Sequence, residues 1–322
     1  MKLNLTNILL FYMLTIGVMI SVSSNNWMMM WSGLEISLMS FIPLMSGGMM
    51  GSESSMKYFI VQSISSSMLI ISILMMISLN SLFNFFFLIS LMLKMGVAPL
   101  HNWVLSIINS LNYSLMFILL TIMKIAPLVL LSFINTWNDM FIIMSLIIGS
   151  FFSLNQNSIR KLLAYSSIYN MGFIISCINM NSIWFLYLFI YSFIMIMLIF
   201  LISKLKINYL NQFMVNEQSI ILKINLSIMI LSLGGLPPLL GFFPKFIIFQ
   251  MMVLKKMFML VILMILTSLL VMFFYMRMMF LMFLNNSTMM KILTKMFIKL
   301  SIWPLIFNMN VFPFIVSFKY YI

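Results

Sequence analysis

The sequence predicts an all-α polytopic membrane protein with about eleven transmembrane helices, arranged as two inverted five-helix repeats with two broken helices. Of its 322 residues, 64% are hydrophobic and 7% are charged, whereas about a quarter of an ordinary soluble domain is charged. The apolar runs are about 20 residues long, which suits a membrane-crossing helix rather than the short alternating strands of a barrel. Helices are therefore the expected element, because lipid offers the backbone no hydrogen-bond partners.

Each expected span is an apolar window that ends at a polar or charged cluster. The windows are 4–22, 27–45, 57–79, 82–107, 111–132, 139–155, 160–178, 182–203, 219–253, 257–282 and 297–318. The ninth window is too long for one straight crossing at 1.5 Å per residue, and it contains the stretch GGLPPLLGFFPK. We therefore expect a broken helix near 234–244, and a second one near 96–99 in the stretch KMGVAPLHNWV.

The two expected breaks lie five spans apart within a single transmembrane domain, residues 1–322. This spacing predicts one repeat over about 1–132, an inverted repeat over about 139–282 and a terminal helix over 297–318. Interrupted helices at corresponding positions of two halves are the best sequence indication of a transport path. The fold class thus already favours transport.

The loop charges predict an orientation. One side holds the larger basic group, Lys2, Lys57, Arg160, Lys161, Lys204, Lys206, Lys291 and Lys295, with Arg277 close by. The other side holds Lys255, Lys256 and Lys319, with Asp139. Because basic residues retain loops on the inner face, the N-terminus is expected there, and the first apolar run is expected to stay as a helix because no cleavage site follows it.

Composition excludes several classes of chemistry. The net charge of +13 is explained by the topology of a membrane protein, so no nucleic-acid partner is expected. A single cysteine, Cys177, and a single histidine, His101, do not provide a disulfide, a haem, a metal site or a Cys-ligated iron–sulfur cluster. The sequence has no nucleotide-binding or nucleophile-elbow motif. Any redox chemistry is therefore expected on another chain.

Four ionisable residues lie well inside apolar spans: Glu35, Lys94, Lys124 and Lys245. Each would cost about 2.5–3.5 kcal/mol at a helix centre, so such residues are expected to face the protein interior and to mark a functional path. The alternative is that a long side chain reaches the membrane surface. That alternative suits the basic residues closer to expected span ends, which are Lys57, Lys223, Arg277 and Lys299.

Prolines beside three of these lysines are expected to loosen the backbone. Each removes the hydrogen bond to a carbonyl four residues earlier: Pro99 to Met95, Pro127 to Met123, Pro237 to Leu233, Pro238 to Gly234 and Pro244 to Leu240. Loosened backbone at membrane depth is tolerated where it is buried in protein or lines a wet cavity. We therefore expect water to reach the lysines.

Proton exchange is the chemistry that these residues suggest. Desolvation favours the neutral form of a buried lysine and a nearby carboxylate restores the charge, so Glu35 is the natural partner of one lysine. Candidate relay residues are His101 after the first break and Ser166, Tyr169 and Asn170 in the seventh span. Two alternatives stay open: His101 can satisfy loop backbone instead, and polar residues in membrane helices often serve packing.

Five ordered blocks give the chain a specific resemblance: GLEISLMSFIPL, KMGVAPLHNWV, MKIAPL, LNQNSIRKLLAYSSIYNMGF and LGGLPPLLGFFPKF. It resembles the family of NADH dehydrogenase subunit 2, the mitochondrially encoded, antiporter-like membrane subunits of respiratory complex I. The resemblance covers nearly the whole chain. Eleven spans look like the animal form of this family.

The resemblance implies a proton-translocating module that is driven by quinone reduction elsewhere in the complex. It implies that Glu35 and Lys94 form an ion pair, that Lys124 is the central lysine and that Lys245 is the exit-side lysine. FMN, iron–sulfur clusters, NADH and ubiquinone would bind other subunits, so this chain would carry no cofactor. The expected partners are other complex I subunits, especially the neighbouring antiporter-like ones, together with lipids.

The expected location is the mitochondrial inner membrane, with the N-terminus on the matrix side. The 40 methionines, with many Ile, Phe, Asn and Ser, also indicate the biased genome of an organelle that translates its own hydrophobic proteins.

The sequence departs from the family pattern at two places. Leu105 and Ser106 stand where relatives usually have proline and an acid. We therefore expect the loop after the fourth span to differ in structure from that of the relatives. Asn170 stands where relatives usually have histidine, which removes one titratable group. Two other functions remain open: a stand-alone cation/proton antiporter and a structural spacer without a proton path.

Overall fold

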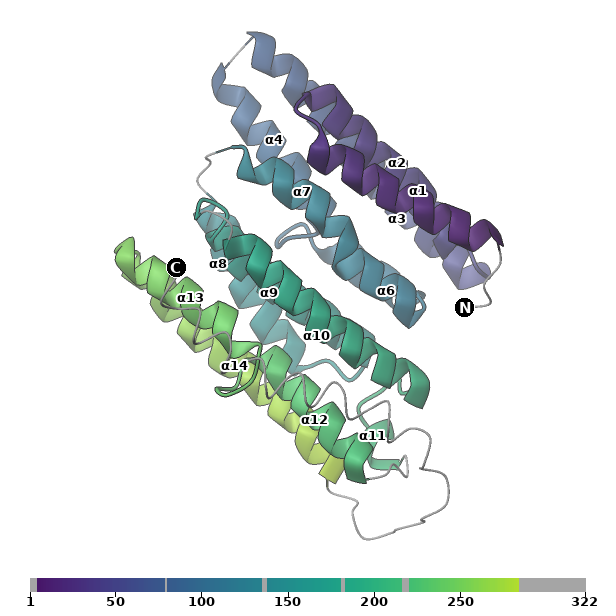
Figure 1. The fold of residues 1–322 in the computed structure, drawn as a ribbon, viewed down its shortest axis with the longest axis vertical. Helices are drawn as coiled ribbons and strands as arrows, with labels where there is room; N and C mark the ends of the chain where they lie inside the picture. Colours follow the sequence, from purple (N-terminus) through teal and green to yellow (C-terminus); the bar gives the residue numbers. More distant parts are fainter. Residues whose placement is uncertain (1–4, 79, 135–137, 181–182, 216–219, 284–322) are drawn as a thin grey trace. The chain divides into compact units, whose positions relative to one another are not determined.

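The structure is a computed structural model that describes residues 5–78, 80–134, 138–180, 183–215 and 220–283 (Figure 1). Within these ranges every regular element is a helix, and one isolated β-bridge joins Ser158 and Tyr209. The chain forms two compact units, Met1–Ser145 and Leu146–Ile322, and the division falls inside one helix. The fold is thus all-helical over the part that the structure describes. The expected terminal helix, 297–318, lies outside the described residues.

Unit 1 contains the helices of the first half of the chain. They are α1 (Leu5–Ser23), α2 (Trp27–Met45), α3 (Met49–Ser78), α4 (Asn80–Met95), α5 (Asn102–Ile108), α6 (Tyr113–Leu120), α7 (Ile122–Ser132) and the first part of α8 (Asp139–Leu154). Helices α1 and α2 lie side by side and approach closely at glycines. A Cβ atom on Gly17 would lie 2.7 Å from the Ser37 nitrogen, so only glycine permits this crossing.

Unit 2 contains the remaining part of α8 and the helices that follow. They are α9 (Ile159–Ser176), α10 (Ile183–Leu205), α11 (Gln212–Val215), α12 (Ile220–Gly234), α13 (Phe242–Leu254) and α14 (Phe258–Phe283). Helix α12 packs against both α10 and α14 (Figure 1). Within the described ranges, six helical segments are long and apolar enough to cross a membrane: Leu5–Ser23, Trp27–Met45, Met49–Met75, Tyr113–Ser132, Ile183–Leu205 and Phe258–Phe283.

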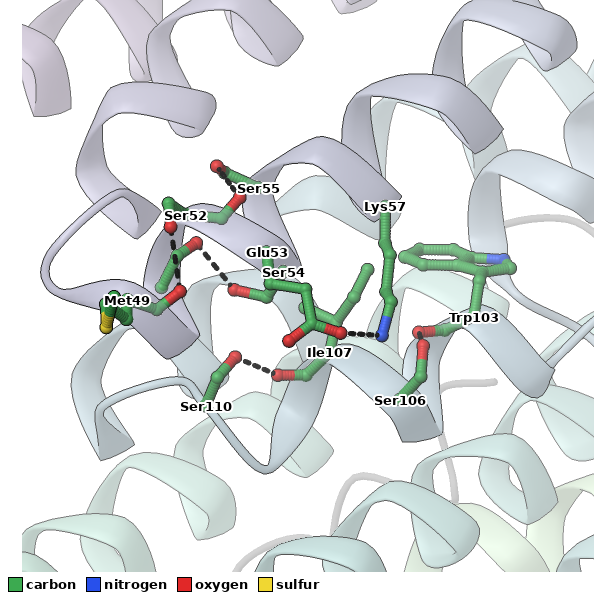
Figure 2. Close-up of polar contacts among 11 residues, drawn as sticks. Met49, Ser52, Glu53, Ser54, Ser55, Lys57, Trp103, Ser106, Ile107 and Ser110 are labelled. Carbon is green, nitrogen blue, oxygen red and sulfur yellow. Dashed lines mark hydrogen bonds and ion pairs between the residues drawn. The ribbon is translucent and has the colours of Figure 1, made fainter.

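The third helix, α3, begins at Met49, earlier than the expected limit of 57. The polar side chains of its first turns find hydrogen-bond or ion-pair partners within the same helix. The hydroxyls of Ser52 and Ser55 donate to the carbonyls of Met49 and Ser52, three residues before each serine. Glu53 and Lys57 form an exposed ion pair at 2.5 Å, one turn apart (Figure 2). A pair at this spacing supports a helix. The polar residues therefore extend α3 instead of ending it.

The fifth expected span, 111–132, is divided into α6 and α7 at Thr121, more than one turn before the proline that was expected to loosen it. Thr121 has φ −125° and ψ −70°. Its N–H and its hydroxyl both donate to the Phe117 carbonyl, at 3.0 and 2.8 Å. A side chain that competes for the helix ladder in this way gives the backbone an alternative to the helix. The interruption places Lys124 in the first turn of α7.

Arg277 makes contacts that the sequence did not predict. From α14, its two terminal nitrogens donate to the carbonyls of Leu154 (2.8 Å) and Gln156 (3.1 Å), at and just beyond the end of α8. The last carbonyls of a helix have no intrahelical partner and carry partial negative charge. Arg277 therefore caps α8 and fastens it to α14.

We expect Arg277→Met to lower the stability of unit 2 by about 1.5–3 kcal/mol, because hydrogen bonds to a charged donor are lost and the carbonyls lose their partner. Thermal unfolding of the detergent-solubilised protein measures this loss. Lys256→Met, at an exposed turn, is the matched control and should leave the melting temperature unchanged. Equal melting temperatures for the two variants would contradict the capping role.

Candidate functional site

The sole acid expected inside a span meets a lysine in unit 1. Glu35 lies in the middle of α2 and Lys94 lies in the last turn of α4. The Lys94 Nζ atom is 3.9 Å from the Glu35 Oε1 atom, and the two side chains are 4% and 22% exposed. Among the described residues, Oε1 of Glu35 is buried and accepts no direct hydrogen bond. The pair is therefore in charge contact without being locked by a short hydrogen bond.

Lys124 lines the same cavity as Lys94, whereas Glu35 does not line it. The Lys124 side chain is buried, and it lines a cavity of about 20 Å³ together with Lys94, Tyr58, Gln62 and Trp103. A polar cavity of this size holds about one water molecule. The structure thus brings three of the four sequence-predicted charges together within unit 1, from helices α2, α4 and α7.

The first helix break is made by glycine. Gly96 has φ +66°, its N–H donates to the Leu93 carbonyl, and the Val97 N–H donates to the Met92 carbonyl. These two bonds form a Schellman motif, which ends a helix at a left-handed glycine. The break expected near 96–99 is present, and this glycine motif ends α4 at Met95, before Pro99 is reached.

Side chains of the protein satisfy the carbonyls at the end of α4. The Trp103 indole donates to the Leu93 carbonyl at 3.2 Å, and the Gln62 amide donates to the Lys94 carbonyl at 3.3 Å. His101 precedes α5 and contacts the Pro99 carbonyl through Nδ1 at 3.2 Å. This contact matches the alternative in which His101 bonds to the loop backbone instead of relaying protons. The neighbourhood of Lys94 is thus buried in protein, as irregular backbone at membrane depth requires.

The second break has the same construction. Gly235 has φ +88°, its N–H donates to the Ser232 carbonyl, and the Leu236 N–H donates to the Leu231 carbonyl. The chain then turns into α13, which begins after Gly241. A Cβ atom on Gly241 would lie 1.7 Å from the Ser232 carbonyl oxygen, so the two halves of the broken helix meet backbone to backbone.

Lys245 lies in the first turns of α13 and reaches back to the end of α12. Its Nζ atom donates to the Gly234 carbonyl at 2.7 Å and to the Leu233 carbonyl at 3.5 Å. These are the two carbonyls that Pro237 and Pro238 were expected to free, and that expectation is confirmed. The C-terminal end of a helix also carries partial negative charge, which stabilises a cation. The ammonium group therefore replaces the missing backbone donors.

Pro244 does not have the expected effect. It lies near the start of α13, where the backbone N–H has no intrahelical partner in any case. A proline at this place is compatible with the helix and removes no bond from it. Lys223 also differs from expectation: it is 6% exposed, because α12 packs against α10 and α14, and it does not extend freely from the helix.

Two of the candidate relay residues of α9, Tyr169 and Asn170, lie near Lys245. Tyr169 places its ring 5.3 Å from the Lys245 Nζ atom, and the Asn170 amide oxygen accepts a hydrogen bond from the Tyr187 hydroxyl at 2.9 Å. Ser166 lies on the same helix, and its hydroxyl donates to the Leu163 carbonyl. The hydroxyl proton of Ser166 is thus used within its own helix.

A cavity of about 10 Å³ lies between α9, α10 and the second break. Its polar lining residues are Asn170, Tyr187, Tyr191, Ser232 and Lys245. Tyr187 and Tyr191 were absent from the sequence-based set of candidates. A tyrosine in an apolar span is the signal that could have found them, because a buried hydroxyl requires a hydrogen-bond partner. The lysine therefore has polar neighbours on α9 and α10 as well as on α12.

The chain matches the model of the NADH:quinone oxidoreductase/Mrp antiporter transmembrane family over residues 24–271. It is 40% identical over 261 residues to NADH-ubiquinone oxidoreductase chain 2 of Anopheles gambiae, covering 76% of each chain. Its structure is similar to a chain of respiratory complex I from Thermus thermophilus, with a TM-score of 0.82, 19% identity and coverage of 96% of this chain and 80% of that chain. A chain of the Mrp complex from Dietzia sp. DQ12-45-1b gives a TM-score of 0.75 at 15% identity, covering 85% and 59%.

We expect Gly241→Ala to destabilise the protein by about 1–3 kcal/mol or more, because the added methyl group would overlap the Ser232 carbonyl and force the broken helix apart. Gly47→Ala is the matched control, since nothing lies within 4 Å of a Cβ atom at that position. Thermal unfolding of both variants measures the difference. Equal stability would show that the two halves of the break do not touch as described.

Proposed function

The chain belongs to the NADH:quinone oxidoreductase/Mrp antiporter family, with NADH-ubiquinone oxidoreductase chain 2 proteins as relatives, and we propose that Glu35, Lys94, Lys124 and Lys245 carry protons through it. It is a proton-translocating, multi-pass subunit of the membrane arm of complex I, and other subunits of that complex are its partners. The observation that carries the proton path is the burial of Lys94, Lys124 and Lys245 beside interrupted helices, with Glu35 in contact with Lys94.

In unit 1 the proposed step is a proton exchange between Lys94 and Lys124. At 3.9 Å, Glu35 favours the charged form of Lys94 without holding its protons in a short hydrogen bond. Lys94 and Lys124 share a cavity that holds about one water, which can accept a proton from one ammonium group and give one to the other amine. A change in the Glu35–Lys94 distance would then decide which lysine is charged.

In unit 2 the proposed carrier is Lys245. The carbonyls of Gly234 and Leu233 stabilise its charged form, while burial favours the neutral form. A small change in the geometry of the break therefore alters the balance between the two forms. Such a lysine can accept and release a proton as the broken helix moves.

The remaining parts of the proposal concern the arrangement of the chain and its surroundings. We propose eleven spans with two inverted five-helix repeats, and the two identical glycine motifs at Gly96 and Gly235 support the equivalence of the breaks. We place the chain in the mitochondrial inner membrane with its N-terminus in the matrix, beside neighbouring antiporter-like subunits and lipids. FMN, iron–sulfur clusters, NADH and ubiquinone are assigned to other subunits.

We expect Lys124→Met to slow proton transfer through unit 1 by at least about 100-fold, since a positioned acid–base group contributes this much or more. The substitution removes the charge and roughly keeps the side-chain length, so the complex should still assemble. Proton translocation per NADH oxidised, measured in proteoliposomes with native-gel analysis of assembly, checks both points. Lys256→Met, at an exposed turn, should behave as wild type.

The Lys124→Met result also separates this proposal from the other two functions. A wild-type proton yield in both Lys124→Met and Lys245→Met would leave the chain a structural spacer. Purification of a monodisperse chain that exchanges cations for protons without partners would favour the stand-alone antiporter.

We expect Lys245→Met to lose its proton-carrying role together with the hydrogen bond to Gly234. Because the Gly234 and Leu233 carbonyls then lack their donor, stability should fall by about 1–3 kcal/mol as well. Lys245→Arg tests the two effects separately: it retains donors for the carbonyls but does not release its proton. Restored stability with absent proton translocation is the expected result, and full translocation by the arginine variant would contradict the carrier role.

A further inference from the structure

An apolar groove of about 670 Å³ lies in unit 2. It is lined mainly by α13, together with Val261 and Ile265 from α14 and Ile183 from α10. Helices α13 and α14 lie side by side (Figure 1). Apart from Gln250, every described residue of the lining is apolar. Water finds too few hydrogen-bond partners in such a space. The groove therefore requires an apolar occupant.

The groove follows one face of α13. Its lining residues recur every three or four positions, at Phe243, Ile247, Gln250 and Leu254, a spacing that places them on the same side of a helix. From Phe243 to Leu254 the helix rises by about 16 Å at 1.5 Å per residue. The hydrocarbon of one leaflet is about 15 Å thick, half of the core of a bilayer. The groove therefore has the length of one acyl chain that runs from the membrane surface to the level of the broken helix.

Polar groups occur at one end of the groove and follow a definite order. Leu254 is 76% exposed, and it is followed by the exposed residues Lys255 and Lys256 in the turn before α14. Gln250 lies one helical turn deeper than Leu254. A phospholipid has the same order, with a charged phosphate at the surface, ester carbonyls below it and acyl chains beyond. The amide of Gln250 can donate to an ester carbonyl, so the lining matches a phospholipid better than a uniformly apolar molecule.

The charge at this end requires a negative partner from outside unit 2. Both ion pairs between described residues lie in unit 1. In the sequence, Glu217 is the single acid after residue 139, and it lies outside the described residues. Lys255 also belongs to the side of the membrane that is expected to hold fewer basic residues, so the retention of basic loops on the inner face does not explain it. Basic residues at a membrane surface attract anionic lipids.

Lys255 and Lys256 differ in their surroundings. The charge of Lys255 acts on Cys177, the residue that ends α9 and lies six positions before Ile183 of the groove lining. Lys256 has φ +60°, and the chain reverses there toward α14. Lys255 is therefore the lysine at the mouth of the groove, whereas Lys256 belongs to the turn.

We propose that the groove binds an anionic phospholipid. Its phosphate contacts Lys255, an ester carbonyl accepts a hydrogen bond from Gln250, and one acyl chain lies along Ile247 and Phe243. The bound chain packs against the outer face of the half-helix whose inner face carries Lys245. Binding at this site does not depend on a proton-carrying role of Lys245.

Photolabelling of the assembled complex tests the headgroup contact. The two probes are a phosphatidylglycerol and a phosphatidylcholine that carry the same diazirine at the end of one acyl chain, each added to phosphatidylcholine nanodiscs. We expect the phosphatidylglycerol probe to label the peptide that contains Phe243 about fivefold more strongly, since one basic residue near a membrane surface contributes this much. Lys255→Gln should reduce that labelling to the level of the phosphatidylcholine probe. Lys256→Gln is the matched control and should leave it unchanged.

A second pair of variants tests the groove itself. Ile265→Trp places a large ring in the groove, so both probes should lose their labelling of the Phe243 peptide. Ile262→Trp is the control, because Ile262 is 54% exposed on the same helix and is not among the described lining residues. Native-gel analysis confirms that each variant complex is assembled before labelling.

Three results would overturn the proposal. Equal labelling of the Phe243 peptide by the two probes in the wild-type complex would show that the site does not select an anionic headgroup. Equal losses in Lys255→Gln and Lys256→Gln would indicate general surface charge instead of a contact at the mouth. A protein helix in the groove, in a map of the wild-type complex, would show that the occupant is not a lipid, and this measurement requires no variant.

Discussion

The hydrogen bond from Lys245 to the Gly234 carbonyl is the contact on which the second half of the structure depends. A helix that stops at membrane depth leaves carbonyls that lipid cannot satisfy, and each would cost several kcal/mol. Two consecutive prolines remove the backbone donors at this place, and a lysine from the next helix supplies others. The break and the charge therefore stabilise one another, since neither is tolerable alone in an apolar surrounding.

The same requirement explains the first break, although the donors differ. There the carbonyls of α4 are satisfied by the Trp103 indole and the Gln62 amide. Lys94 is consequently available for a different contact, and it faces the Glu35 carboxylate. Because neutral side chains satisfy the carbonyls at the first break, Lys94 contacts the carboxylate and lines a cavity together with Lys124. In unit 2, by contrast, the lysine satisfies the backbone and carries the charge.

The sequence predicts those features that depend on local chemistry. The Gly-Pro stretches predicted the positions of both breaks. Because a proline leaves the carbonyl four residues earlier without its backbone donor, they also predicted free carbonyls at Leu233 and Gly234, and Lys245 binds both. The glycine caps at Gly96 and Gly235 were not predicted, because glycine and proline occur together and only the φ angle separates their effects. The role of Arg277 could not be predicted, since its acceptors at Leu154 and Gln156 are brought near only by helix packing. Tyr187 and Tyr191 were missed for the same reason, because apolar periodicity does not show which rings line the cavity beside Lys245.

The two breaks place their lysines on opposite sides of the interruption, yet both lysines belong to the same kind of helix end. Lys94 precedes Gly96 and lies within the last turn of α4, whereas Lys245 follows Gly235 on α13 and reaches back to the last turn of α12. In each case a half-helix ends in a Schellman glycine with its negative dipole end near a buried ammonium group. Half-helix ends of this kind coordinate coupling ions in transporters with broken helices. Movement of either half-helix would weaken or strengthen the field at its lysine, because dipole effects fall off within one turn. A change of backbone position can therefore be converted into a change of protonation without any new residue entering the site.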